Sequence, residues 1–177
     1  STLRAEGMVQ TRQGAGAFVS PSILRPFRLT PRQAAPITPQ KLFELRTGVE
    51  MQAAALAAER ASEAQIDAIA EAYAAMERDI AAGSDSVASD VQFHRRIAEA
   101  SGNELFASFL DFMADHIRGT IKESREGEAW QTHRDEVMAE HQALLHAIRR
   151  RDPEAARDAA QAHMDNCLRR CLPASGD

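Results

Sequence analysis

The stretch MQAAALAAERASEAQIDAIAEAYAAMERDIAA, residues 51–82, decides the fold class. Alanine has the highest intrinsic helix propensity, and its small side chain lets neighbouring helices approach closely. Aromatic residues, which strands favour together with β-branched ones, make up only 5% of the 177 residues. The stretch therefore predicts an all-α protein built from closely packed helices.

On either side of this stretch, capping residues divide the chain into six predicted helices. They span roughly residues 39–60, 63–82, 85–100, 103–126, 129–150 and 152–172. Helix starts are indicated by Thr38 before Pro39, by Ser62, by Asn103 and by Asp152 before Pro153, and helix ends by Gly83 and Gly102. Because the connections are short, we expect an antiparallel bundle of about six helices.

The residues before the bundle read as a β-hairpin and a linker. Residues 8–12 and 17–19 are predicted strands on either side of a glycine-containing turn, and residues 1–5 resemble the end of a helix. Four prolines follow at intervals of five, which disfavours a helix. We therefore predict a hairpin remnant over 1–20, a linker over 21–38 and a helical domain over 39–173. A two-stranded hairpin is marginal alone, so we expect its natural partner to lie outside this chain.

Charge and cysteine content exclude several broad classes. The net charge of −5 does not fit a generic nucleic-acid binder, although the first thirty residues are locally basic. The two cysteines, Cys167 and Cys171, are spaced so that they cannot easily bridge on one helix, so no disulfide framework is expected. No apolar run reaches membrane-spanning length, which favours a cytoplasmic protein without a membrane partner.

Four polar residues occupy positions where helix periodicity calls for aliphatic side chains. They are Asp90, His94, His141 and His163, and they lie on three different predicted helices. One acid and three imidazoles meeting in a core suit Zn²⁺ first, with Ni²⁺, Mn²⁺, Fe²⁺ or Co²⁺ as alternatives. The pattern predicts a divalent transition-metal site with a coordination position left open for water or a ligand oxygen.

Simpler interpretations of the same residues exist. A single core histidine is usually hydrogen-bonded and structural, and Asp90 with His94 could form an ordinary buried pair. Arg46 is a candidate to bind a ligand carboxylate, but its position equally suits a solvated surface arginine. His133 could line the same pocket or lie on the surface.

LRAEGMV (3–9) and TRQGAGAFV (11–19) resemble the end of the winged helix-turn-helix domain in the GntR family of bacterial transcription regulators. LFELR (42–46), DVQFH (90–94), SGN (101–103), EH (140–141) and His163 resemble the FCD effector domain of the FadR-type subfamily. Nearly the whole chain is covered, except the proline-rich linker.

The resemblance implies a dimeric, effector-responsive regulator that binds operator DNA in its full-length form. It implies that the four polar residues are the metal ligands, and that Arg46 contacts a small organic acid. Asn103 and His133 are further candidate contacts for the acid. Arg12, Gln13 and Gly14 would lie at the wing tip near the DNA backbone. The recognition helix is missing, so we do not expect this chain to bind operator specifically.

Two other functions compete with a regulator. A metal-dependent enzyme is one, since an open position on Zn²⁺ can activate water. Neither an HExxH nor an ExxH motif is present, and only Glu140, next to His141, offers a general base. A purely structural bundle with a polar core is the other. We therefore expect a sensor of small carboxylates rather than an enzyme.

Overall fold

The computed structural model describes residues 9–12, 16–19, 38–124 and 128–171. It divides into two units, residues 1–32 and 33–177. In the first, β1 (Val9–Arg12) and β2 (Gly16–Val19) pair antiparallel, with Val9 opposite Val19 and Arg12 opposite Gly16. The predicted wing-tip residues Gln13 and Gly14, the predicted helix end at 1–5 and the linker up to residue 37 lie outside the described residues.

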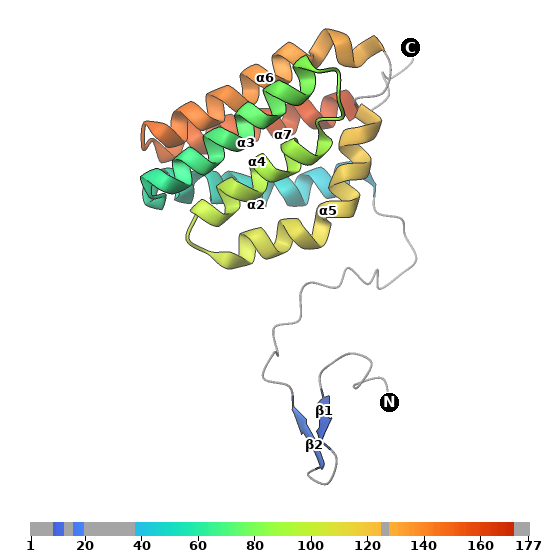
Figure 1. The fold of residues 1–177 in the computed structure, drawn as a ribbon, viewed down its shortest axis with the longest axis vertical. Helices are drawn as coiled ribbons and strands as arrows, with labels where there is room; N and C mark the ends of the chain where they lie inside the picture. The colour runs from blue at the N-terminus through green and yellow to red at the C-terminus, as the bar shows by residue number, and fades with distance from the viewer. Residues whose placement is uncertain (1–8, 13–15, 20–37, 125–127, 172–177) are drawn as a thin grey trace. The chain divides into compact units, whose positions relative to one another are not determined.

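The described residues of the second unit form six helices, close to the predicted boundaries. They are α2 (Pro39–Arg60), α3 (Glu63–Ala81), α4 (Val87–Ala100), α5 (Glu104–Ser124), α6 (Glu128–Arg149) and α7 (Pro153–Cys171). Successive helices run in alternating directions, as predicted for an antiparallel bundle (Figure 1). Among the described residues, no helix combines the length and apolar character needed to cross a membrane.

Local sequence accounts for where these helices begin and end. Thr38 and Ser62 cap α2 and α3 through their side-chain oxygens, and Gln65 completes a capping box with Ser62. Gly83 and Gly102 have φ values of +67° and +74°, in the left-handed region that favours glycine, and they follow the ends of α3 and α4. The helix-end prediction at both glycines is confirmed.

The alanine-rich helix α2 lies against α7 and α4, although only a short turn separates it from α3 along the chain (Figure 1). Five alanines of α2 are at most 2% exposed: Ala53, Ala54, Ala55, Ala57 and Ala58. Their partners on α7 include Ala156 and Ala160, also buried. Small side chains on both surfaces allow this close approach, which brings the two ends of the helical domain's sequence together.

Two apolar clusters fill the bundle. One is built mainly from α2, α3, α4 and α6 around Phe93 and Ile148, and the other is built largely from α5 with parts of α2 and α4. A set of buried polar side chains comes from α2, α4, α6 and α7, comprising Arg46, Glu50, Asp90, His94, His141 and His163. Such a concentration of ionisable groups in a core requires mutual pairing or a bound ion.

Candidate metal centre

Three histidines from three helices meet in the core of the bundle. His94 lies on α4, His141 on α6 and His163 on α7, and all three are buried. One ring nitrogen from each lies within 4.8 Å of the corresponding nitrogens of the other two. The rings of His94 and His163 stack at 5.1 Å between centroids, and those of His141 and His163 lie 4.3 Å apart. The predicted convergence of the three histidines is thus present.

Each histidine is held by its Nδ1 atom. His94 Nδ1 lies 2.6 Å from Glu50 Oε2, and His141 Nδ1 lies 2.8 Å from the carbonyl oxygen of Val137. His163 Nδ1 lies 2.8 Å from Glu140 Oε2. The carbonyl oxygen of Val137 and Glu140 Oε2 are acceptors, so these two hydrogen bonds place a proton on Nδ1 of His141 and His163, while His94 Nδ1 lies at ion-pair distance from Glu50. In a neutral ring protonated at Nδ1, the lone pair is on Nε2. This is the usual outer arrangement of metal-binding histidines.

The inner nitrogens are spaced as metal ligands are. His94 Nε2 and His141 Nε2 lie 3.3 Å apart. Two nitrogens bound to one tetrahedral zinc at about 2.0–2.1 Å would be separated by about 3.3–3.4 Å. Two facing lone pairs repel each other at this distance unless a proton or cation lies between them. The residues present therefore fit a divalent cation.

Asp90 adjoins the histidines from the preceding turn of α4. Its side chain is buried, and Oδ1 lies 3.4 Å from His141 Nε2, again the separation of two ligands on one ion. The compact group of ring nitrogens within 4.8 Å contains the three histidines, and Asp90 contacts it through His141. Asp90 thus supplies a negative charge next to the imidazoles.

Arg46 is fully buried rather than solvated. Its Nε donates to Glu50 Oε1 at 2.8 Å, and its guanidinium lies 5.2 Å from the centre of the Phe43 ring. Burial raises the pKa of Glu50, but Arg46 and His94 outweigh it and hold that pKa well below its usual range. Glu50 therefore stays ionised and links Arg46 to His94.

Glu140 plays the corresponding part for His163. Its oxygens also accept from Asn166 Nδ2 at 2.6 Å and from Arg170 at 2.7 and 3.0 Å. Burial raises the pKa of Glu140, but the hydrogen bonds from His163, Arg170 and Asn166 lower it to about 2. This ionised carboxylate is committed to neighbouring side chains, so it is not a free general base.

Cys167 adds a thiol beside His163, with Sγ 3.6 Å from Nε2. In the absence of a cation, burial lowers the pKa of His163, but Cys167 and Glu140 outweigh this effect and raise it to about 10. Burial also lowers the pKa of His141 well below its usual value, helped by the nearby His163, so His141 stays neutral. A cation bound at His163 would replace a proton there.

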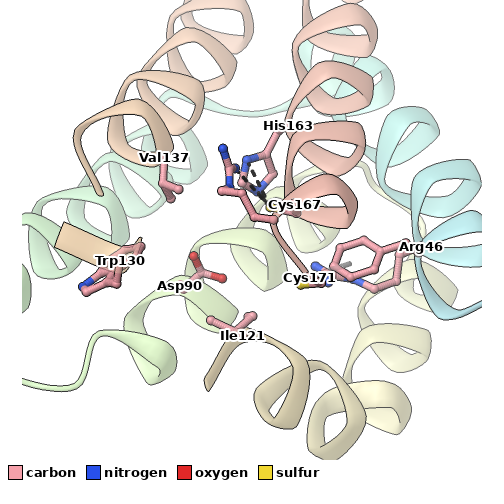
Figure 2. A pocket seen from close by; sticks show the side chains of 10 residues that line it. Arg46, Asp90, Ile121, Trp130, Val137, His163, Cys167 and Cys171 are labelled. Carbon is pink, nitrogen blue, oxygen red and sulfur yellow. Dashed lines mark hydrogen bonds between the residues drawn. The ribbon is translucent and has the colours of Figure 1, made fainter. Parts of the chain in front are cut away.

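A cavity of about 30 Å³ borders these residues. Figure 2 shows Asp90 between Trp130 on one side and Arg46 and Cys171 on the other, with His163 and Cys167 above. The volume corresponds to about one water molecule in the liquid. A larger ligand would have to displace side chains or extend beyond the cavity.

Two predicted effector contacts lie elsewhere. Asn103 is in the turn between α4 and α5, where its Oδ1 accepts from the backbone N–H of Leu105. His133 is partly exposed on α6, with Nδ1 3.1 Å from Glu136 Oε2. Neither residue lines the cavity at Asp90, so their predicted contact with an effector there has no support in this geometry.

Sequence reasoning also missed Glu50. A signal existed, because Arg46 and Glu50 are four residues apart and therefore share one face of a helix that is otherwise rich in alanine. An acid–base pair on a buried face indicates a paired charge in the core. What periodicity does not reveal is that this face of α2 meets His94 of α4.

Comparisons with known proteins identify the family of the helical domain. A family model described as FCD domain matches residues 41–166. The HTH-type transcriptional regulator LutR of Bacillus subtilis is 29% identical over 178 residues, covering 94% of this chain and 78% of the relative. The HTH-type transcriptional repressor NanR of Citrobacter rodentium is 30% identical over 177 residues, covering 94% of this chain and 66% of the relative.

Solved structures show the same fold. A GntR protein of Streptococcus agalactiae is similar with a TM-score of 0.64 and 26% identity, covering 95% of this chain and 77% of that one. McbR/YncC of E. coli has a TM-score of 0.63 at 18% identity, with 93% and 77% covered, and supports the fold alone. About a quarter of each of these longer chains has no counterpart here, so the similarity concerns the part the chains share.

Proposed function

Because this chain belongs to the FCD domain family of GntR-type transcription regulators, we propose that its helical domain senses a small carboxylate at a bound metal. The proposed ligands are Asp90, His94, His141 and His163, with Zn²⁺ as the expected ion. The relatives are named transcription regulators, and the chain is a regulatory domain rather than an enzyme.

One observation carries the metal assignment. Each histidine offers its Nδ1 atom to an acceptor on its own or a neighbouring helix, which turns three Nε2 lone pairs inward. The Nε2 atoms of His94 and His141 then face each other at 3.3 Å, where a shared proton or a cation is needed to offset the repulsion between their lone pairs. When bound, the metal would supply a Lewis-acidic position for a carboxylate oxygen.

The chain's own residues would then position the acid. Arg46 lines the cavity beside Asp90, and its guanidinium is kept charged and fixed by Glu50. Arginine binds carboxylates in a planar, paired geometry, so Arg46 would orient the acid while the metal holds one oxygen. The small cavity requires neighbouring side chains to move when the acid enters.

We propose that this movement of side chains couples effector binding to DNA binding. In the full-length protein, effector binding would change the packing of the helices and thereby the affinity of a dimer for its operator, with a coupling of about 1–3 kcal/mol. Arg12 at the end of β1 would contribute to DNA contacts in the wing, together with Gln13 and Gly14. A cytoplasmic location follows from this function.

The test is the metal content of the purified chain, measured by mass spectrometry. The wild type should carry a transition metal close to one per chain, and His141→Ala and His163→Ala should lose it. His133→Ala is the matched control, because His133 is partly exposed and lies outside the cavity. Circular dichroism would verify that each variant keeps its helices.

Metal-free wild-type protein, even after incubation with Zn²⁺ or Ni²⁺, would contradict the metal assignment. Retention of metal in both core variants would contradict the ligand set. If metal is present, thermal shifts with small carboxylates test the effector assignment separately, and turnover of any acid would favour the metal-dependent enzyme instead.

A further inference from the structure

A second hollow lies beside the metal cavity and opens to solvent. It is a groove of about 370 Å³ between the α3–α4 turn, the end of α5 and the start of α6. Its polar lining consists of Ser84, Asp85, Ser86, Lys122, Gln131 and Arg134. The groove is thus more than ten times as large as the cavity at Asp90.

The groove and the cavity share Trp130, which lines both. The same helices continue from one hollow to the other. On α4, Val87 lines the groove and Asp90 the cavity, one turn apart. On α6, Arg134 lines the groove and Val137 the cavity. Trp130 therefore borders both the open polar groove and the cavity at Asp90 and His163.

The two hollows differ in volume, so they can hold different parts of one ligand. The cavity of about 30 Å³ accommodates roughly one water, or one carboxylate oxygen bound to a metal. The remaining atoms of an organic acid need space elsewhere, and the groove offers it directly beyond Trp130. In Figure 2, Trp130 lies on the opposite side of Asp90 from Arg46 and Cys171, so the two sides of the cavity are distinct.

The charges in the groove indicate what the rest of the ligand carries. Lys122 and Arg134 place two cations against one acid, Asp85. Asp85 Oδ1 already accepts from the backbone N–H of Val87 at 2.9 Å, at the start of α4. Arg134 donates to the Gln131 amide oxygen at 3.1 Å, and its Nε lies 3.5 Å from the exposed carboxylate of Asp135, which does not line the groove. A second anionic group would be attracted to these two cations.

We propose that the groove is the outer half of the effector site, and that the effector is an organic acid with an anionic group at each end. One end reaches the metal past Trp130, and the other binds Lys122 and Arg134. This proposal rests on the proposed function for the inner end only. Trp130 is then the residue that must move for the acid to bind.

Trp130 is the only tryptophan of the chain, so its fluorescence reports on this position alone. The zinc-loaded chain would be titrated with succinate, glutarate and adipate, each against the monocarboxylate of the same carbon number. At least one diacid should bind about tenfold more tightly than its monocarboxylate, since hydrogen bonds to charged groups contribute that much. Its binding should also shift the emission of Trp130.

The double variant Lys122→Gln with Arg134→Gln should lose the preference for the diacid and bind monocarboxylates as the wild type does. The matched control is Arg96→Gln with Arg118→Gln, which changes the net charge equally at exposed arginines outside both hollows. It should retain the preference.

Two results would overturn the proposal. Equal binding of diacids and monocarboxylates, with Trp130 emission unchanged, would exclude the groove and leave the proposed function intact. Failure of every acid to bind the zinc-loaded chain would overturn both the groove and the carboxylate sensor, while leaving the metal site standing.

Discussion

Replacing Glu50 should lower both the free energy of unfolding and the affinity for zinc, whereas replacing an exposed acid should change neither by much. Glu50 bridges Arg46, at 2.8 Å, and His94, at 2.6 Å, and the side chains of all three residues are at most 6% exposed. The substitution Glu50→Gln preserves shape but removes the negative charge. Two buried groups, the Arg46 guanidinium and the His94 imidazole, would then lose the negative charge that they share.

The size of the effect follows from burial. Removing one member of a buried ion pair costs about 3–5 kcal/mol, because the other charge stays uncompensated in the core. The amide of glutamine still accepts one hydrogen bond from Arg46, so we expect a loss near the lower end, about 3 kcal/mol. Loss of the group that orients a metal-binding histidine should weaken zinc affinity by about 10- to 100-fold.

The matched control is an exposed ion pair with almost the same nitrogen–oxygen distance. Glu71 and Arg78 also lie 2.9 Å apart, but their side chains are 73% and 63% exposed. Glu71→Gln should therefore cost less than about 1 kcal/mol and leave zinc affinity unchanged. Urea unfolding of the metal-free proteins gives the stabilities, and zinc titration against a competing chelator gives the affinities. The reasoning is refuted if both variants unfold at the same urea concentration and bind zinc equally.

Three further predictions concern backbone, cap and acid stability. Gly83→Ala should lower the free energy of unfolding by about 1 kcal/mol, because φ is +67° at this residue. Gly48→Ala, in the middle of α2, should raise the free energy of unfolding by about 0.5–1 kcal/mol. Thermal unfolding midpoints that move in the same direction for both variants would contradict this pair of predictions. Ser62→Ala should lose about 1 kcal/mol by removing the α3 capping box, and urea unfolding that matches the wild type would show that the cap is dispensable. Since the pKa of Glu140 is lowered from 4.5 to about 2, its contribution in metal-free protein is complete above pH 4.5 and is lost as pH falls to about 2. Urea unfolding over this range should therefore give a flatter pH profile for Glu140→Gln, and a profile parallel to the wild type would argue against the paired carboxylate.

The local sequence determined where the helices begin and end and which of their faces are buried. Helix propensity, capping at Thr38 and Ser62, and glycine at Gly83 and Gly102 act within a few residues, so the six helices could be placed before any tertiary contact was known. The same periodicity put the three histidines on buried faces, because a polar residue at an apolar position is visible in the sequence alone.

Contacts between distant helices could not be obtained in this way. Which face of α2 meets α4 and α7 depends on the packing of small side chains across more than a hundred residues, and no local period encodes it. That packing places Glu50 against His94, and the pairing of α6 with α7 places Glu140 against His163. It also leaves Asn103 at a helix cap and His133 at the surface, since motif position alone does not tell which side of a bundle a residue faces.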